Sequence, residues 1–463
     1  MSTYKTGIAV IGGGPAGYVA AIRAAQLGGE VTLVEKEKLG GVCLNVGCIP
    51  TKAILRSCEI LTFIKNAKEF GLEAGEARIN LSQLMTRKKR IVARLVGGVD
   101  YLLKKNRIQV IKGEARFIDT STLEIKGEEE KAIKADKIII ATGSYPASFP
   151  LDGIDREAVL TSTEALDIEE VPEEFLIIGA GAIGVEFAHI YSTLGSKVTL
   201  VEMLSQILPG EDEEISETLR KIMTKKGIDI FTSSTLQKVK KEGSRYKGII
   251  KTPQGEKEVF FDKILISIGR RPNSKNLNLE KVGVKTDEKG WIKVNSQMQT
   301  TTPNIFAAGD VIGGYLLAHV AYAEGEVASE NAMGENSHIN YRAVPRFICS
   351  MPEIASVGLT EKKAKESGYN VKVGKFPFSA NGKAIIHGER EGMVKIISDA
   401  ETEEILGIHI LGPEATDLIL EGTLAINQES TLNEIIDTIH PHPTLGEAIK
   451  EAALDAQKRA IHI

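Results

Sequence analysis

The sequence has few cysteines, no excess of basic residues and no long apolar run. Four cysteines in 463 residues are too few for a structural disulfide framework, so a close pair among them is more often catalytic, redox-sensing or metal-binding. The net charge of -5 gives no basic field, and we expect no nucleic-acid partner. No apolar run reaches the roughly 18 residues of a membrane span, so we expect no membrane association.

Metal binding and secretion are not expected either. Zinc usually takes four Cys or His ligands in short paired spacings, whereas only one close cysteine pair occurs here, Cys43 and Cys48. The opening residues Met1–Lys5 lead straight into a predicted strand without a signal or transit segment, which predicts a cytoplasmic protein. The length exceeds that of one ordinary core and indicates roughly three domains.

Two glycine-rich turns occur in the same local context. In each copy an apolar strand enters the turn, a helical stretch follows, and a second strand ends at an acid 23 positions after the first glycine (35 − 12 and 202 − 179). The glycines and acids are Gly12, Gly14, Gly17 and Glu35 in the first copy, and Gly179, Gly181, Gly184 and Glu202 in the second. This pattern is typical of dinucleotide sites, where glycines admit a pyrophosphate and the acid binds ribose hydroxyls.

The second copy favours NAD over NADP. Glu202 ends its second strand, and residues 203–207 contain no Arg or Lys. A 2′-phosphate would therefore meet a carboxylate and no cation.

A second repeat marks where the chain leaves each dinucleotide domain. Residues 138–146 and 264–272 are both apolar, strand-like runs that end at a glycine, Gly143 in the first and Gly269 in the second, and then a proline. Alternating segments at 112–137 and 246–261 predict small antiparallel excursions.

The cysteine pair lies in the segment Gly40–Lys52 and forms a reducible dithiol or disulfide, which exchanges two electrons as flavins and nicotinamides do. Pro50 favours a first helical turn and so places Cys48 at a helix N-terminus, where a thiolate is stabilised. A regular helix would separate the two Cα atoms by about 8.6 Å, beyond the roughly 7 Å limit for a disulfide. We therefore expect a distorted turn at Asn45 and Gly47.

Over essentially its whole length the chain resembles the pyridine nucleotide–disulfide oxidoreductases. The resemblance rests on residues 40–52, the paired glycine turns, Ile305–Asp310 and His440–Glu447. It implies FAD in the first dinucleotide site, with Asp310 on the flavin chain, and NAD in the second. It also implies a C-terminal domain that dimerises and lends a histidine to the partner's active site.

The resemblance implies roles for several single residues. Cys43 exchanges with a substrate dithiol, Cys48 faces the flavin, Lys52 is a cation near the flavin, and Glu186 is the acid beside the nicotinamide. Cys58 and Cys349 are expected to be small buried hydrophobic residues.

Dithiol oxidation needs a base, because an ordinary thiol is mostly protonated at neutral pH. His442 is the best candidate, with Glu447 to orient its imidazole. Glu447 has a structural alternative, since residues 444–447 fit a capping box that starts a helix. His440 is expected to be structural, and His319 a packed helical histidine near the flavin.

We therefore expect an α/β protein with two Rossmann-like dinucleotide-binding domains, for FAD and NAD, and a C-terminal α+β dimerisation domain with helices near 414–428 and 447–460. The expected boundaries are 1–147 for the FAD domain, 148–270 for the NAD domain, 271–341 for a segment completing the FAD domain, and 342–463 for the interface domain.

The implied reaction is oxidation of protein-bound dihydrolipoamide to lipoamide with reduction of NAD+ to NADH. The implied partners are a second copy in a homodimer and the lipoyl domains of 2-oxo acid dehydrogenase or glycine cleavage complexes. Family members that use NADP carry basic residues after the second turn, and others carry a C-terminal cysteine pair; this chain has neither. Two departures from the family pattern, Val42 and residues 346–351, leave the partner open. Reduction of another small disulfide, and a flavoprotein acting mainly as a binding subunit, remain alternatives.

Overall fold

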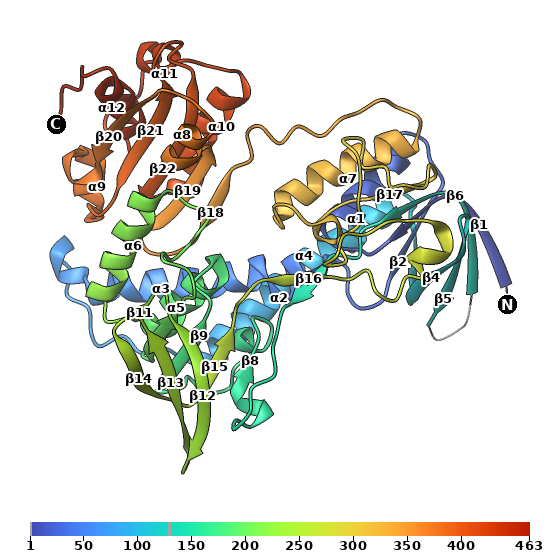
Figure 1. Ribbon diagram of the computed structural model, residues 1–463, viewed down its shortest axis with the longest axis horizontal. Helices are drawn as coiled ribbons and strands as arrows, with labels where there is room; N and C mark the ends of the chain where they lie inside the picture. The colour runs from blue at the N-terminus through green and yellow to red at the C-terminus, as the bar shows by residue number, and fades with distance from the viewer. Residues whose placement is uncertain (1, 128–130) are drawn as a thin grey trace. The chain divides into compact units, whose positions relative to one another are not determined.

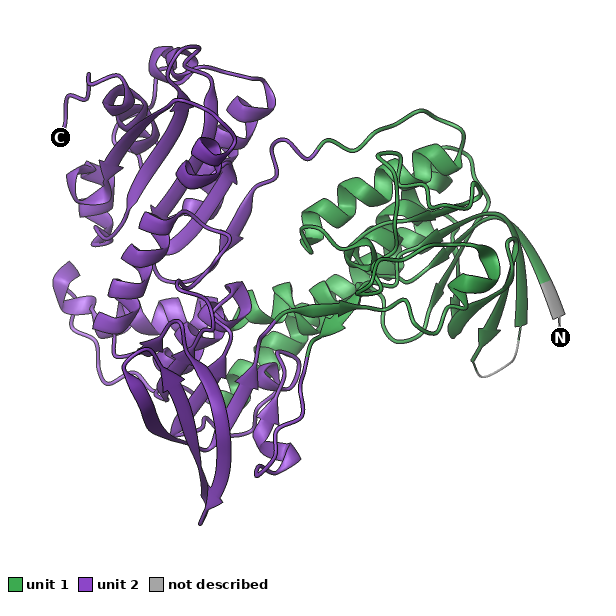
Figure 2. Cartoon of the chain, viewed as in Figure 1, with its two compact units in different colours: residues 1–54, 81–147, 269–340 green, residues 55–80, 148–268, 341–463 purple. Residues whose placement is uncertain are grey.

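The computed structural model describes residues 2–127 and 131–463 and divides into two compact units (Figures 1 and 2). Unit 1 comprises residues 1–54, 81–147 and 269–340, and unit 2 comprises residues 55–80, 148–268 and 341–463. Each unit is therefore assembled from segments that are far apart in the sequence.

Unit 1 is built on a mixed sheet in the order β3-β2-β1-β6-β5-β4, with β17 also paired to β6. The strands β3, β2, β1, β6 and β17 are parallel, whereas β4 and β5 are the antiparallel excursion expected from their alternating pattern. The bounds are β1 (Ser2–Ile11), β2 (Val31–Glu35), β3 (Gln109–Lys112), β4 (Glu114–Asp119), β5 (Thr122–Lys126), β6 (Lys131–Ile140) and β17 (Ile305–Ala307).

The apolar run at the end of β1 is buried on both faces, as in other covered parallel sheets. Ile8 and Val10 belong to one hydrophobic cluster, and Ala9 and Ile11 belong to another, because successive side chains of a strand point to opposite faces. Helices α1 and α7 pack against each other beside the sheet (Figure 1). The helices of unit 1 are α1 (Pro15–Gln26), α2 (Gly41–Val46), the start of α3 (Cys48–Lys65), α4 (Leu81–Lys105), η4 (Leu279–Val282), η5 (Asp310–Ile312) and α7 (Ala318–Ala332).

A short antiparallel ribbon of β7 (Ser144–Pro146) and β16 (Arg270–Pro272) completes unit 1. It joins the two places where the sequence leaves and re-enters this unit. Segments far apart in the sequence are thereby brought together, with Ser144 opposite Pro272.

Unit 2 contains a second parallel sheet in the order β11-β10-β9-β15-β8 and an antiparallel sheet β12-β13-β14. These elements are β8 (Val159–Leu160), β9 (Glu174–Ile178), β10 (Lys197–Val201), β11 (Asp229–Phe231), β12 (Thr235–Glu242), β13 (Arg245–Thr252), β14 (Gly255–Phe261) and β15 (Lys263–Ile266), with helices η1 (Ala67–Phe70), η2 (Arg156–Ala158), η3 (Glu164–Leu166), α5 (Ala182–Leu194) and α6 (Glu213–Lys225). β13 and β14 account for the second expected excursion.

The C-terminal part of unit 2 is an antiparallel sheet in the order β18-β19-β22-β21-β20 with helices packed on it. Its elements are β18 (Arg346–Ile348), β19 (Glu353–Gly358), α8 (Glu361–Glu366), β20 (Val371–Pro377), η6 (Phe378–Ala380), α9 (Gly382–His387), β21 (Met393–Asp399), β22 (Ile405–Gly412), α10 (Ala415–Asn427), α11 (Leu432–Asp437) and α12 (Glu447–Ala456). The helix expected at 447–460 was predicted too long: it ends at Ala456, and a turn with Lys458 at φ 58° follows.

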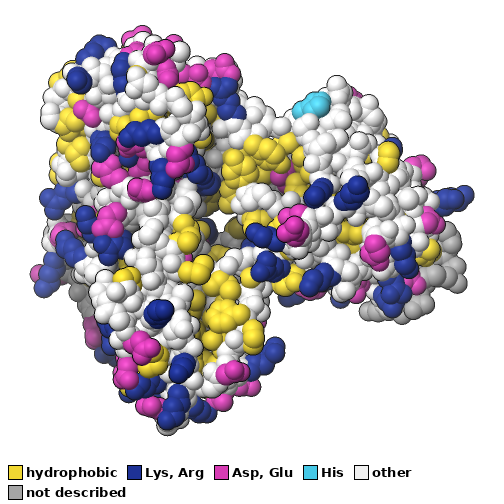
Figure 3. Space-filling model, in the orientation of Figure 1, with side chains coloured by type: hydrophobic (Ala, Val, Ile, Leu, Met, Phe, Trp, Pro, Cys, Tyr) yellow, Lys and Arg dark blue, Asp and Glu magenta, His cyan; other side chains and the backbone are white. Residues whose placement is uncertain are grey.

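The surface carries charges of both signs. On the face seen in Figure 3, basic and acidic side chains are interspersed, in keeping with the small net charge. Among the described residues, no helix combines the length and the apolar character needed to cross a membrane.

Candidate functional site

The first glycine-rich turn lies between β1 and α1. A β-carbon at Gly17 would collide with the carbonyl oxygen of Gly12, so only glycine lets the helix start this close to the turn. Glu35, at the end of β2, accepts the N–H of Gly13 at 2.6 Å on one carboxylate oxygen and that of Glu37 at 2.7 Å on the other. The acid is therefore fixed against the turn.

The second turn, between β9 and α5, repeats this arrangement atom for atom. A β-carbon at Gly184 would collide with the carbonyl oxygen of Gly179. Glu202 accepts the N–H of Ala180 at 2.7 Å and that of Leu204 at 2.9 Å. The equal spacing seen in the sequence therefore corresponds to equal geometry.

The middle glycine of each turn faces open space. A β-carbon at Gly181 would meet no atom within 4 Å, and one at Gly14 would meet only the Cα of Gly41 at 3.7 Å. Both glycines are N-caps without a side-chain cap, and neither following helix has an acid in its first turn. Each helix N-terminus therefore offers free backbone N–H groups and positive potential to an anionic group such as a pyrophosphate.

The cysteine segment is tied to the first of these turns. The N–H of Gly40 donates to the carbonyl oxygen of Gly13 at 2.8 Å. Gly41, at φ 54°, begins α2 so close to Gly14 that a β-carbon there would contact its Cα. The backbone thus places the thiols beside the first dinucleotide turn.

The segment forms two helices rather than one. α2 ends at Val46, Gly47 takes φ −139° and ψ −114°, and α3 begins at Cys48. The Asn45 amide donates to the carbonyl oxygens of Leu39 and Gly41 at 2.9 and 2.8 Å and so stabilises this break. The expectation of a distorted turn at Asn45 and Gly47, with Cys48 at a helix start, is confirmed.

The break brings the two thiols together. They lie near 3.2 Å from each other and are not joined by a disulfide. A hydrogen bond with Cys48, together with burial, raises the pKa of the Cys43 thiol. Cys43 is 9% exposed and Cys48 is exposed. The hydrogen bond and the burial therefore both favour the protonated thiol form of Cys43.

Charged groups surround this pair. Lys52, one turn into α3, favours the thiolate form of Cys43, whereas Asp310 disfavours it. Asp310 begins η5 directly after Gly309, whose N–H donates to the buried Glu324 at 2.8 Å. Unit 1 thus contains a dithiol, a cation and a carboxylate beside its dinucleotide turn.

The two exit glycines lie at the ends of the ribbon. Gly143 and Gly269 have φ values of 70° and 112°. Asn273 fixes the first exit, since its N–H donates to the carbonyl oxygen of Gly143 at 2.9 Å and its amide to that of Thr142 at 3.1 Å. The glycines therefore turn the chain where it leaves and re-enters unit 1.

Glu186 lies within α5, buried, and one of its oxygens accepts the N–H of Cys349 at 3.0 Å. Cys349 is only partly buried, so the expectation that it is a buried hydrophobic residue is wrong. It sits at the end of β18, where the chain turns toward α5. Cys58, by contrast, is fully buried as expected, and burial raises its pKa to about 12.

His442 and Glu447 form a close pair at the start of α12. The imidazole Nδ1 lies 2.8 Å from Glu447 Oε1, and Glu447 Oε2 accepts the N–H of Thr444 at 2.8 Å. Burial opposes ionisation, but these hydrogen bonds prevail and lower the pKa of Glu447. Glu447 therefore contacts both the imidazole and the Thr444 N–H, while 80% of the His442 side chain is exposed. The N-cap of α12 is Gly446 without a side-chain cap, so residues 444–447 do not form the capping box that their sequence fits.

Two further histidines named in the sequence analysis, His440 and His319, differ in their surroundings. His440 is held through both ring nitrogens, by the Thr438 carbonyl and by Glu421, each at 3.0 Å, and Glu421 raises its pKa. This agrees with a structural role. His319 lies in the first turn of α7 and is partly buried.

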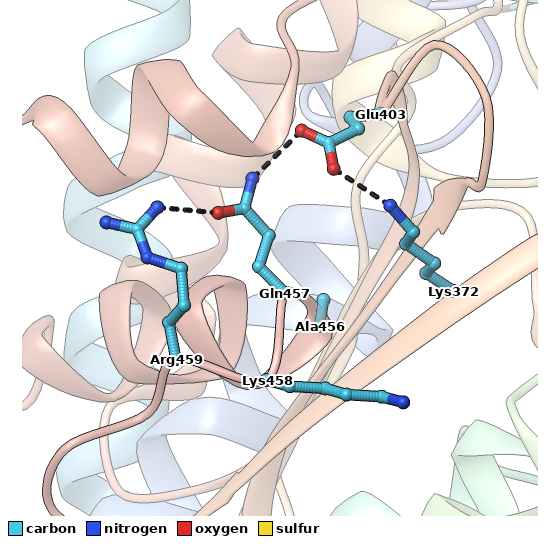
Figure 4. A pocket seen from close by; sticks show the side chains of 6 residues that line it. All are labelled: Lys372, Glu403, Ala456, Gln457, Lys458 and Arg459. Carbon is cyan, nitrogen blue, oxygen red and sulfur yellow. Dashed lines mark hydrogen bonds and ion pairs between the residues drawn. The ribbon is translucent and has the colours of Figure 1, made fainter.

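A cavity of about 520 Å³ lies elsewhere, at the end of α12 (Figure 4). Its polar groups satisfy one another: Glu403 accepts from Lys372 and from Gln457, and Arg459 donates to Gln457. Its lining residues include no cysteine and no histidine, so they cannot perform the thiol or acid–base reactions considered above. The lining residues are Lys372, Glu403, Ala456, Gln457, Lys458 and Arg459.

Two residues at the site received no role from the sequence. Ser144 and Arg270 each follow an exit glycine, and their side chains contact each other and Asp310. The repeat of Gly143 and Gly269 was the available signal, but only the fold shows that the two residues meet.

Comparison with known proteins agrees with this site. The model of the pyridine nucleotide-disulphide oxidoreductases matches residues 6–325, and that of their dimerisation domain matches residues 344–453. Dihydrolipoyl dehydrogenases from Thermus scotoductus and Bacillus subtilis are each 46% identical to the chain, covering 100% and 98% of it and 99% and 98% of their own lengths. The mitochondrial enzyme of Schizosaccharomyces pombe is 42% identical, covering 97% of the chain and 89% of its own length.

Solved structures resemble the whole chain as well. LpdA from Mycobacterium tuberculosis has a TM-score of 0.89 at 29% identity, covering 98% of this chain and 99% of its own. The HOCl-induced flavoprotein disulfide reductase RclA from Escherichia coli, as its Cu(II) complex, has a TM-score of 0.87 at 28% identity, covering 97% and 99%. Because both family models match and together span nearly all of its length, the chain belongs to the pyridine nucleotide-disulphide oxidoreductases and carries their dimerisation domain.

Proposed function

We propose that this enzyme oxidises protein-bound dihydrolipoamide to lipoamide and reduces NAD+ to NADH. The observation that carries the proposal is the dithiol of Cys43 and Cys48, held beside a dinucleotide turn by the hydrogen bond from Gly40 to Gly13. Relatives named dihydrolipoyl dehydrogenase, at 42 to 46% identity over almost the full length, support the choice of substrate.

The first glycine-rich turn suits FAD, and the second suits NAD. Open space over Gly14 and Gly181, each at an uncapped helix N-terminus, fits a pyrophosphate in both. Asp310, close to the thiols, would hold the flavin chain, and Glu186 would lie beside the nicotinamide. When bound, the flavin relays an electron pair between sulfur and nicotinamide. The domain boundaries given above, with FAD in the first and third segments and NAD in the second, are part of this proposal.

The two cysteines have different tasks. In the oxidised enzyme, a substrate thiolate attacks the sulfur of Cys43, the Cys43–Cys48 bond breaks, and Cys48 leaves as a thiolate. The second substrate thiol then attacks the mixed disulfide, closes the lipoamide ring and releases Cys43, which takes up a proton. The raised pKa of Cys43 supports this assignment, because a released Cys43 then takes up a proton readily.

His442 is the base that removes the substrate proton and returns one to Cys43. Glu447 holds the imidazole through Nδ1, so that Nε2 faces the substrate. The dimerisation domain supports a homodimer, in which His442 would serve the site of the partner chain. The dihydrolipoamide substrate would be carried by lipoyl domains of 2-oxo acid dehydrogenase or glycine cleavage complexes. The low number of cysteines favours a cytoplasmic location of the protein.

The test is an assay of the purified flavoprotein with free dihydrolipoamide and NAD+, following NADH formation. Changing Cys43→Ser or Cys48→Ser should abolish turnover, whereas Cys58→Ala, a buried thiol outside the pair, should preserve it. Turnover preserved in either of the first two variants would exclude the mechanism. Bound flavin without turnover of the wild type would favour a binding subunit instead.

The nucleotide preference is tested separately. Both oxygens of Glu202 are engaged beside the second turn, so a 2′-phosphate would meet fixed negative charge. We expect a clear preference for NAD+ in kcat/KM, and equal or better use of NADP+ would contradict the assignment.

A further inference from the structure

A buried arginine lies beside the Asp310 carboxylate. The Arg270 side chain is 12% exposed, and its Nε is 3.6 Å from Asp310 Oδ2. Nε donates to the Ser144 hydroxyl at 2.6 Å, and Nη2 donates to the Ser144 carbonyl oxygen at 2.8 Å. The guanidinium is therefore held in one orientation by a single residue on the opposite strand of the ribbon.

Ser144 transmits this contact to the acid. Its hydroxyl, in a side chain on a residue that is only 2% exposed, donates to Asp310 Oδ2 at 2.5 Å. Within the described part of the chain, no hydrogen bond reaches the other oxygen, Oδ1. One oxygen is thus engaged by the protein, and the other can accept a hydroxyl from a ligand.

The same cluster reaches the thiols. Arg270 attracts the Cys48 thiolate, and Asp310 acts on Cys43 in the opposite sense. Burial lowers the pKa of Arg270, but a guanidinium remains charged in proteins. The ionisable groups that interact with the pair are Lys52 on α3, Asp310 on η5, Arg270 on β16, Tyr18 on α1 and Tyr322 on α7.

We propose that Arg270 is a positioning residue of the flavin site: through Ser144 it presents Asp310 Oδ1 to the hydroxyl chain of the flavin. The inference rests on the proposed function, since it takes FAD to be the ligand at the first glycine-rich turn. One guanidinium then links the residue that binds the cofactor chain to the thiol that reacts with the ring.

The chain offers a matched control one residue away. Arg271 is exposed, lies on the same strand and is part of none of these contacts. Arg270→Gln removes the charge and most of the hydrogen bonds to Ser144, whereas Arg270→Lys keeps the charge. Ser144→Ala removes the hydroxyl that joins Arg270 to Asp310. Arg271→Gln removes an equal charge from the surface and is the control.

The first readout is the affinity of the apoprotein for FAD, measured by quenching of flavin fluorescence. Arg270→Gln and Ser144→Ala should each weaken binding by about tenfold, the loss expected for a charge-assisted hydrogen-bond relay. Arg271→Gln should bind as the wild type does. In an Asp310→Asn background, Arg270→Gln should add little, because both changes remove the same interaction; full additivity would overturn the positioning role.

The second readout is the reactivity of the Cys48 thiol, which can be measured without catalytic turnover. In a Cys43→Ser background, the pH dependence of alkylation at Cys48, resolved by peptide mass spectrometry, should shift upward by about one pH unit in Arg270→Gln. Arg270→Lys should restore much of the wild-type profile, which a purely structural defect would not allow.

The outcomes separate the two proposals. If wild-type apoprotein does not bind FAD, the proposed function fails and the inference with it. If the wild type binds FAD but Arg270→Gln matches Arg271→Gln in both affinity and alkylation profile, the inference alone is wrong.

Discussion

The two cysteines of the pair lie in different surroundings. Cys43 is buried, and its hydrogen bond with Cys48 and its burial raise the pKa of its thiol, whereas Cys48 is exposed at a helix start. Cys58 lies in the same helix as Cys48 but is fully buried, so position in a helix alone does not make a thiol reactive.

That contrast gives a prediction for Cys58. Because the thiol is fully buried and its pKa is raised to about 12, it stays protonated and unreactive at neutral pH. Cys58→Ser should leave turnover unchanged but lower the free energy of unfolding by about 1–2 kcal/mol, since a hydroxyl is costlier to bury than a thiol. Urea unfolding and steady-state kinetics measure both effects, and loss of turnover in a stably folded variant would contradict the prediction.

Glu447 should matter more for rate than for stability. In Glu447→Gln the amide oxygen can still accept the Thr444 N–H, but the amide nitrogen donates toward His442 Nδ1 and favours the wrong tautomer. We expect kcat/KM for dihydrolipoamide to fall by about 10² to 10⁴-fold, with a small change in thermal midpoint.

The same helix supplies the control for that change. Glu451, one turn later on α12, makes an equivalent 2.8 Å contact with Nδ1 of His462. Glu451→Gln should therefore cost stability without a comparable loss of rate. Equal kinetic losses in the two variants would remove the reason for assigning His442 and Glu447 to the reaction.

At the scale of elements, α5 carries a buried group that makes the fold sensitive to acid. His189 is 8% exposed, its Nε2 has no hydrogen-bond partner among the described residues, and burial lowers its pKa to about 4, with Lys226 acting in the same sense. The unfolded chain takes up a proton at a higher pH than the folded one does. Stability should therefore decrease as the pH falls from 6.5 toward 4.

His189→Leu should remove this acid sensitivity. At pH 4 the variant should exceed the wild type in unfolding free energy by about 2 kcal/mol more than it does at pH 7. Exposed His338 gives the control, because His338→Leu should leave the pH dependence unchanged. Urea midpoints at several pH values measure the difference; parallel curves for wild type and His189→Leu would show that the histidine is not responsible.

Local patterns predicted the elements that build the two dinucleotide turns. The strand–glycine–helix order, the acid at a fixed distance and the break at Gly47 are all consequences of backbone sterics and periodicity that act over a few residues. The end of α12 was missed because only a local turn at Lys458, not a helix-breaking residue, stops it. Proline or glycine would have marked that end in the sequence.

Contacts between distant segments could not be predicted. Arg270 and Ser144 are 126 residues apart; each follows an exit glycine, but no local pattern shows that the two exits meet. Lys395, buried in the C-terminal sheet, likewise pairs with Asp212 and Glu214 at the start of α6 and with Glu361 of α8. Nothing local marks these partners, because ion pairing depends on which strands and helices the fold brings together.

The state of association is a property of the whole molecule, and an apolar stripe on α10 bears on it. Leu420 and Leu424 lie one turn apart and are 61% and 63% exposed, and Ile439 nearby in sequence is 91% exposed. All three belong to the segment matched by the dimerisation domain. Between the two leucines, Glu421 holds His440, so the stripe adjoins the loop that carries His442.

A charge in this stripe should separate the copies and stop the dithiol reaction together. Leu424→Glu buries a carboxylate in an apolar contact, so we expect monomers in sedimentation velocity. Dihydrolipoamide oxidation should fall at least as far as in Glu447→Gln, because each site would lack the partner's histidine, whereas NADH oxidation by an artificial acceptor should persist. Ile118→Glu is the control: it places the same charge at another exposed apolar residue, on β4, and this variant should remain dimeric and active. A monomeric Leu424→Glu with full dithiol turnover would mean that each chain uses its own histidine.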